Sequence, residues 1–200
     1  MKVLSIFILL TGAYSQEQII IAEGMTGHKL LDFVVENYKP VEVLSWEHAK
    51  DTLYSIIDLQ ENNQLTCVYT GYTITLNTGL DPSTDADSKG VNAEHTYPQS
   101  MGADYEPMKS DMHHLYPVRA AVNSSRNNAP YYDIDDSKTD VWFYLDFDQS
   151  NIPTDNIDSY SEKENDTPDK FEPREDHKGN AARSVFYFYA MYKDSASYIF

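Results

Sequence analysis

The chain has almost no cysteine. Cys67 stands alone among 200 residues, so no disulfide can form within the chain, even though an exported protein could form one. It lies in the stretch LTCVYTGY among strand-forming residues. We therefore expect Cys67 to be a small buried apolar side chain rather than a reactive thiol.

Positive charge is also scarce. The chain carries 15 Lys and Arg against 32 Asp and Glu, a formal net charge of −17. This balance argues against broad attraction to polyanions, which usually needs a basic surface. It does not exclude a nucleic-acid substrate, because a local cationic patch or a bound divalent ion can recruit a phosphate.

Long apolar runs are absent after the first residues. Residues 1–15, MKVLSIFILLTGAYS, combine a lysine, a short apolar run and small residues. That pattern is typical of a secretory signal peptide and too short to span a bilayer. We expect a secreted protein of extracellular or periplasmic location, without a membrane segment, whose mature chain forms a single monomeric domain over residues 16–200.

Periodicity predicts a mixture of helices and strands. Apolar residues recur at helical spacing in 28–38 and 46–58, and 180–192 reads as a buried helix that is apolar on most faces. Strand-forming residues fill 65–76, as a strand or bent hairpin, and 141–147. The segment 81–90, DPSTDADSKG, reads as an acidic loop. Residues of about 148–178 are acidic and dotted with proline, and we expect a mobile excursion there. The fold class is therefore α+β, a mainly helical domain around a small antiparallel sheet.

Three of the six histidines lie within twenty residues of each other, and a glutamate precedes the first. The runs NAEHTYP and HHLYP resemble the two strands of a hairpin, and Pro117 suits the first turn of a helix that follows. On that helix Asn123, Arg126 and Asn127 share one face. The hairpin could then bring Glu94 and His95 opposite Asn123. Such a cluster can be a metal site, a catalytic base with its support, or a polar loop.

Carboxylate and amide oxygens are hard ligands, so Glu94 and Asn123 would suit Mg²⁺, Ca²⁺ or Mn²⁺ better than zinc. An imidazole beside the ion could deprotonate a water, because its pKa lies near working pH. Glu94 and His95 would point to opposite faces of a regular strand. They can serve one site only if the chain is irregular there or the strand ends there.

The segments EHTYPQS, SDMHHLYP and VNSSRNN, in this order, resemble the endonuclease I family of secreted and periplasmic nucleases, which belongs to the His-Me finger (ββα-metal) nucleases. Residues 171–192 also resemble the closing segment of that family. The resemblance implies a ββα-metal finger and a secreted, nonspecific endonuclease that hydrolyses DNA and possibly RNA with the help of Mg²⁺, or else Ca²⁺ or Mn²⁺.

The same resemblance implies the roles of individual residues. His95 corresponds to the general base on water, and Glu94 and Asn123 correspond to the metal ligands. Arg126 corresponds to an arginine to which we assign a phosphate-binding or buttressing role and which we count among the catalytic residues. An arginine that some members carry between the two halves of the motif has no counterpart here, and Lys109 is the cation in that stretch.

Lys109 and Arg183 are our substrate-binding candidates, with an ion pair to a buried acid as the alternative for Arg183. We expect His113 and His114 to alternate on a strand and to support the site by hydrogen bonding. Two other functions stay open. One is a calcium-dependent extracellular binding protein that uses the acidic loops. The other is a zinc hydrolase that uses His95, His113 and His114.

Overall fold

The computed structural model describes residues 20–196. The chain divides into two compact units, Met1–Asn37 and Tyr38–Phe200. The predicted signal peptide, residues 1–15, lies outside the described residues. The single domain predicted over residues 16–200 stays a prediction.

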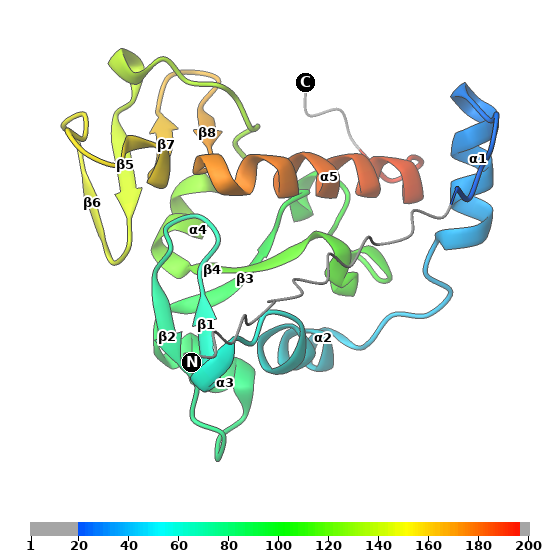
Figure 1. The fold of residues 1–200 in the computed structure, drawn as a ribbon, viewed down its shortest axis with the longest axis horizontal. Coiled ribbons are helices and arrows are strands. Elements are labelled where there is room, and N and C mark those ends of the chain that lie inside the picture. Colours follow the sequence, from blue (N-terminus) through cyan, green and yellow to red (C-terminus); the bar gives the residue numbers. More distant parts are fainter. Residues whose placement is uncertain (1–19, 197–200) are drawn as a thin grey trace, which may run out of the picture. The chain divides into compact units, whose positions relative to one another are not determined.

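The described chain alternates short helices and short strands (Figure 1). The helices are α1 (Gly27–Tyr38), α2 (Trp46–Thr52), α3 (Pro82–Ser88), α4 (Ala120–Arg126) and α5 (Glu175–Met191). The strands are β1 (Gln64–Thr66), β2 (Thr73–Thr75), β3 (Val91–His95), β4 (Leu115–Arg119), β5 (Val141–Tyr144), β6 (Phe147–Gln149), β7 (Ser161–Glu164) and β8 (Lys170–Glu172). This mixture fits the predicted α+β class.

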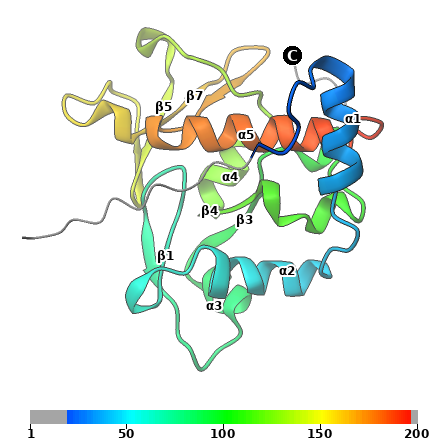
Figure 2. The ribbon, with the colours of Figure 1, turned by 45° about the vertical axis from the view of Figure 1, so that its right-hand side comes forward.

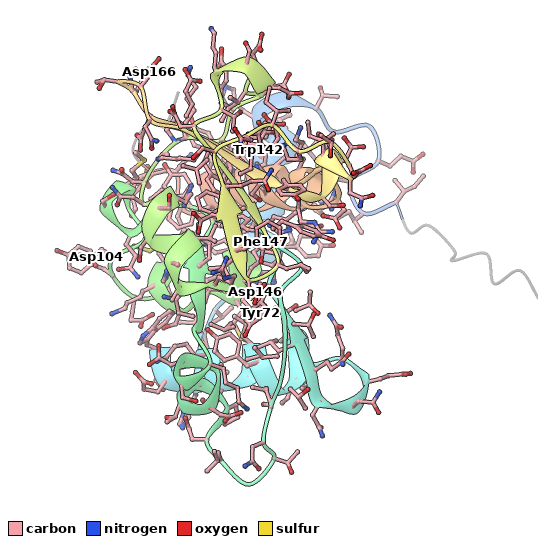
Figure 3. All side chains as sticks on the ribbon, turned by 90° about the vertical axis from the view of Figure 1, so that its left-hand side faces the viewer. Tyr72, Asp104, Trp142, Asp146, Phe147 and Asp166 are labelled. Atoms are coloured by element: carbon pink, nitrogen blue, oxygen red, sulfur yellow. The ribbon has the colours of Figure 1, made fainter. Side chains whose placement is uncertain are left out.

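The strands form three separate antiparallel sheets rather than the single small sheet that we predicted. Two are pairs, β1–β2 and β3–β4, and the third has four strands in the order β6-β5-β7-β8. The turn between β5 and β6, which bears Asp146, lies beside the turn that bears Tyr72 (Figure 3). There the Leu145 amide donates to the Thr70 carbonyl at 2.8 Å, so the four-stranded sheet is tied to the β1–β2 hairpin.

The β3–β4 pair separates two apolar cores. Because side chains alternate along a strand, Val91 of β3 and Leu115 of β4 join one core with residues of α2 and the β1–β2 hairpin. Val118 faces the other side and packs in the second core with Val122 of α4. Figures 1 and 2 show this pair at the centre, with α5 on one side and α2 and α3 on the other.

Several predicted elements are confirmed. The helix predicted over 28–38 is α1, although none of its side chains is buried. The helix predicted over 46–58 is α2, continued by a π-helical turn to Ile57. The bent hairpin predicted over 65–76 is β1 and β2. Cys67 lies in the first core and is fully buried.

The predicted start of the helix after the second histidine run was wrong. Pro117 lies within β4, opposite Ala93, and α4 begins at Ala120. A proline is tolerated here because β4 pairs with only one strand, so the missing N–H removes no bond from a second partner. The Pro117 carbonyl accepts a hydrogen bond from the Val68 amide at 3.0 Å.

The acidic loop predicted over 81–90 is largely the helix α3. Asp81 caps it by accepting from the Thr84 amide at 2.8 Å, and Pro82 occupies the first turn, where its missing N–H costs nothing. Asp85 is also engaged, by the Asn77 amide at 2.9 Å and by Lys89 at 2.6 Å. These carboxylates already have partners, so the segment gives no support to the calcium-binding alternative.

Helix α5 is buried along one face and not on most faces as predicted. The buried residues His177, Ala181, Ser184, Phe188 and Met191 recur at intervals of three and four, which is the period of a single helix face. In contrast, Phe186 is 75% exposed. The apolar composition of this helix therefore does not predict which of its side chains are buried.

The predicted excursion of about 148–178 contains strands β7 and β8 and part of β6. All four residues of β7 are buried, including Glu162, whose carboxylate accepts from Thr139, and Lys163, which pairs with Asp169. The acidic sequence is thus part of a sheet. Its predicted mobility stays a prediction.

A search of the described residues finds no helix with the length and apolar character that a membrane crossing requires.

Candidate functional site

Strands β3 and β4 and helix α4 form the unit that positions the predicted site residues. The strands pair antiparallel from Val91↔Arg119 to His95↔Leu115, and α4 follows β4 directly. The pairing is regular up to His95, where β3 ends. Glu94 and His95 therefore leave the strand on opposite faces at its last two positions. The expectation that the strand ends at this pair is met.

Glu94 is buried on the face that meets α4 and is 3% exposed. Its Oε1 accepts from the Tyr69 hydroxyl at 2.8 Å and from Arg126 Nη1 at 2.9 Å. Burial is the main influence on its carboxyl and raises the pKa, while the Arg126 guanidinium opposes this. The carboxylate is therefore held by a hydroxyl and a cation in a region closed to solvent.

His95 faces the first core, on the opposite side from Glu94. Its ring stacks on Trp46 of α2, with centroids 5.2 Å apart and an angle of 25° between the planes. Nε2 lies 2.8 Å from the Lys109 carbonyl and Nδ1 lies 3.1 Å from the Gln99 amide nitrogen. A carbonyl can only accept, so Nε2 carries the proton and the lone pair is on Nδ1.

Burial lowers the pKa of His95 from 6.5 to about 3, because the charged imidazolium loses its hydration. The neighbouring His114 and the cations Lys109 and Arg126 lower the pKa further, whereas the hydrogen bond to the Lys109 carbonyl raises it. The ring is therefore neutral at neutral pH, and Nδ1 is free of a proton.

Asn123 lies on α4 and is only partly buried. Its Nδ2 donates to Asn92 Oδ1 at 2.9 Å and to the Ala93 carbonyl at 3.3 Å. Both N–H groups of the amide are therefore directed at β3, which fixes the plane of the amide and leaves the Oδ1 lone pairs for another donor or a cation. Asn123 thus contacts the strand that carries Glu94 and His95, through their neighbours.

Arg126 is buried, with 1% of its surface exposed. Besides Glu94, it donates to the carbonyls of His95 and Thr96, each at 3.1 Å. Its guanidinium also lies over the Tyr131 ring, 4.6 Å from the centroid. These contacts hold the end of β3 in place and favour the buttressing role over direct contact with a phosphate.

The two predicted substrate-binding cations lie in different surroundings. Lys109 is part of the loop before β4; its carbonyl accepts from His95, and its ammonium lies 5.7 Å from the Trp46 ring centroid. Arg183 is exposed on α5, where it donates to Asn180. The structure thus brings Lys109 next to His95, whereas Arg183 bonds a residue of its own helix.

His113 and His114 lie in a 3₁₀ turn, Met112–His114, rather than on a strand as predicted. His113 is paired with Asp111 at 2.7 Å, and His114 Nε2 lies 2.8 Å from the Met108 carbonyl. Each therefore supports the loop before β4 by hydrogen bonding, as we expected. The three histidines of the zinc alternative, His95, His113 and His114, each bond a different partner. Residues 20–196 contain no group of three His, Cys, Asp or Glu side chains suited to a metal. Neither observation supports the zinc alternative.

The donor set does fit a mostly hydrated, hard divalent ion. Glu94 could supply a carboxylate, and Asn123 could supply an amide oxygen, because its own N–H groups are occupied elsewhere. Such an ion takes one or two protein oxygens and keeps several waters, so a cluster of three acidic ligands is unnecessary. Arg126 already partly neutralises Glu94, which predicts weak rather than tight ion binding.

Sequence reasoning missed three neighbours of the site. Asn92 lies two residues before Glu94, and strand alternation could have identified it as a partner on the same face. Trp46, at the start of the helix predicted over 46–58, stacks on His95. Tyr69, which holds Glu94, is 25 residues away along the chain, and no local signal connects the two.

Comparison with known proteins identifies the family of this chain. An extracellular ribonuclease of Bacillus subtilis (strain 168) is 28% identical over 181 residues, which cover 88% of this chain. The chain spans about half of that relative's length, 54%. Residues 26–199 match the Endonuclease I family, a family of nucleases, which are phosphodiester hydrolases. Because this match covers most of the length of the chain, the chain belongs to the Endonuclease I family.

Proposed function

We propose that this protein is a secreted endonuclease that hydrolyses phosphodiester bonds of DNA and RNA without reading a long sequence, with a divalent ion as cofactor. The observation that carries the proposal is His95, a neutral imidazole whose protonated nitrogen is tied to a backbone carbonyl and whose other nitrogen bears a lone pair. Membership in the Endonuclease I family supports a nuclease, and the extracellular relative supports secretion.

His95 is the general base in this proposal. Displacement of the exposed Gln99 amide would leave Nδ1 open to a water molecule, from which it takes a proton as the water attacks phosphorus. The Lys109 carbonyl then stabilises the imidazolium, since the Nε2–H bond strengthens when the ring becomes charged. A positioned base of this kind typically contributes a factor of ~10²–10⁴ in rate.

Glu94 and Asn123 are the proposed ligands of the ion, which we propose to be Mg²⁺, with Ca²⁺ or Mn²⁺ as the alternatives. A bound divalent ion supplies charge stabilisation to the phosphate and to the departing oxygen. Arg126 and Tyr69 orient the Glu94 carboxylate through Oε1. Lys109, beside His95, is the proposed contact to phosphate, and Arg183 is a more remote one.

The test is degradation of plasmid DNA and of single-stranded RNA with Mg²⁺, with Ca²⁺, with Mn²⁺ and with a chelator. We expect cleavage with Mg²⁺ and none with the chelator. His95→Ala should lower the turnover number by ~10²–10⁴ while nucleic-acid affinity changes little. His48→Ala, an exposed histidine on α2, is the matched control and should keep the wild-type rate. Wild-type turnover in His95→Ala would exclude His95 as the base.

A further inference from the structure

A cavity of about 390 Å³ lies on the side of β3 that faces α2 and α3. Its walls come from α2 and the π-helical turn after it, from α3 and from residues Val91, Asn92 and Ala93 of β3. Its volume is within the range of ~300–1,000 Å³ that is usual for small-molecule sites. None of the roles proposed above uses this cavity.

The cavity shares residues with both halves of the proposed site. Trp46 lines it and also stacks on His95. Asn92 lines it and accepts the hydrogen bond from Asn123. A phosphodiester held at His95 would therefore place one of its nucleosides next to this cavity, on the side of β3 where Trp46 lies.

The lining carries a group that lacks a partner. Tyr54 is 1% exposed, and its hydroxyl has no hydrogen-bond partner among the described residues. Asp87 also lines the cavity, and its charge is among the influences that raise the pKa of this hydroxyl after the larger effect of burial. A buried hydroxyl without a partner is unfavourable, and a polar ligand in the cavity would satisfy it.

The charges in the lining select the kind of ligand. Glu47 and Asp87 are exposed carboxylates, and the cation Lys50 is already paired with Glu47 at 2.8 Å. With two acids against one cation, the cavity disfavours a phosphate. It favours an uncharged group that presents N–H donors, because an ionised carboxylate only accepts hydrogen bonds.

From these observations we infer that the cavity binds one unpaired nucleobase of the substrate, next to the scissile phosphate, and that it prefers a base with an exocyclic amino group. The base must be unpaired, because a base within a duplex cannot enter a side-chain cavity. Guanine should bind best, since its ring N–H and its amino group lie side by side and can meet both oxygens of a carboxylate. The inference rests on the proposed function and adds to it a preference at one nucleotide.

Cleavage-site mapping tests the inference. The substrates are single-stranded uridine tracts with one central guanosine, with inosine at that place, or with uridine throughout, and the matching thymidine tracts in DNA. We expect cleavage beside guanosine to exceed cleavage at other positions by at least ~10-fold, the effect of about one hydrogen bond to a charged group. Inosine, which lacks the amino group, should lose most of this preference. Even cleavage along all tracts would overturn the inference and leave the proposed nuclease activity intact.

Variants of the lining locate the effect. Asp87→Asn should lower the ratio of guanosine-directed to other cleavage by ~10-fold, whereas Asp104→Asn, an exposed aspartate that does not line the cavity (Figure 3), should leave it unchanged. Tyr54→Phe should lower the ratio without lowering the melting temperature, because the hydroxyl loses no partner in the free protein. A lower melting temperature with an unchanged ratio would show that Tyr54 is only structural.

Guanosine binding separates this inference from the proposed function. In a chelator, with no cleavage, guanosine should quench the fluorescence of Trp46 with an affinity at least ~10-fold higher than that of uridine, and Asp87→Asn should remove the difference. If the protein cleaved no nucleic acid with any divalent ion, the proposed function would fail, and this binding would still decide the inference. Equal binding of guanosine and uridine would then overturn it.

Discussion

Replacement of Arg126 should be among the most destabilising single changes in this fold. The guanidinium is 1% exposed and donates to Glu94, to the His95 carbonyl and to the Thr96 carbonyl. Arg126→Met keeps much of the volume but leaves the buried Glu94 carboxylate without its cation and the carbonyls of His95 and Thr96 without this donor. Removing one partner of a buried ion pair typically costs ~3–5 kcal/mol. For a chain of this size that corresponds to a decrease in melting temperature of ~6–20 °C.

A double-mutant cycle measures how much of this cost belongs to the ion pair. The free energy of unfolding would be determined by urea denaturation for wild type, Arg126→Met, Glu94→Gln and the double variant. We expect a coupling energy of ~1.5–3 kcal/mol, the range of a hydrogen bond to a charged group. Arg183→Met, at an exposed arginine, is the matched control and should change stability by less than ~0.5 kcal/mol. A coupling energy near zero would refute the pairing of Glu94 with Arg126.

Three further predictions concern acid, metal and salt. Burial lowers the pKa of both His114 and His177 to about 4. The contribution of each histidine to the free energy of unfolding is therefore complete above pH ~6.5 and decreases as the pH falls towards 4, by ~2 kcal/mol for each residue at pH 5. His95, whose pKa burial lowers to about 3, adds a third loss of similar size. The carboxyls of Glu162 and Asp58, whose pKa burial raises to about 7 and about 6, oppose these losses with gains of ~2 and ~1 kcal/mol, so denaturation between pH 7 and 5 should show a net loss of ~2 kcal/mol; constant stability would contradict the burial of the histidines. Asn123→Ala should raise the Mg²⁺ concentration for half-maximal cleavage, because it removes an oxygen ligand, and an unchanged titration would place the ion elsewhere. The slope of log affinity for duplex DNA against log salt should be shallower than about −6, because each neutralised phosphate contributes about −0.9 and, of the predicted cations beside His95, Arg126 is already paired with Glu94 and leaves Lys109; a steeper slope would reveal a basic surface that the composition does not indicate.

The elements that sequence periodicity predicted are those with simple amphipathic or alternating patterns. Trp46, Ala49 and Leu53 recur at helical spacing, and Ala49 and Leu53 are buried in α2 and the turn after it. The prediction failed where charged residues are buried. The sequence SEKE of β7 resembles a solvated loop, yet Thr139, Asp169 and Lys170 provide partners for its charges. No local pattern reveals such partners, because they lie outside β7, in strand β8 and in two connecting segments.

Two predictions about where a helix begins were wrong for a related reason. Pro117 suits both a helix start and an edge strand, and only the pairing of Ala93 with Pro117 decides between them. In 81–90 the alternating carboxylates suggested a loop, although Asp81 followed by Pro82 is also a sound helix start. The capping bond from the Thr84 amide shows which of these the chain adopts.

The residues of the candidate site could be named from the local sequence, whereas their arrangement depends on strand β3. Adjacent residues on a regular strand cannot share a face, so Glu94 is held by Tyr69 and Arg126 and His95 by Trp46 and Lys109. The two groups can act on one phosphate only around the end of β3. Arg126 binds the carbonyls of the two residues at this end, His95 and Thr96, as well as Glu94. One buried arginine therefore fixes the Glu94 carboxylate and the backbone of His95 together, and any change at Arg126 should disturb the proposed ion site and the proposed base at once.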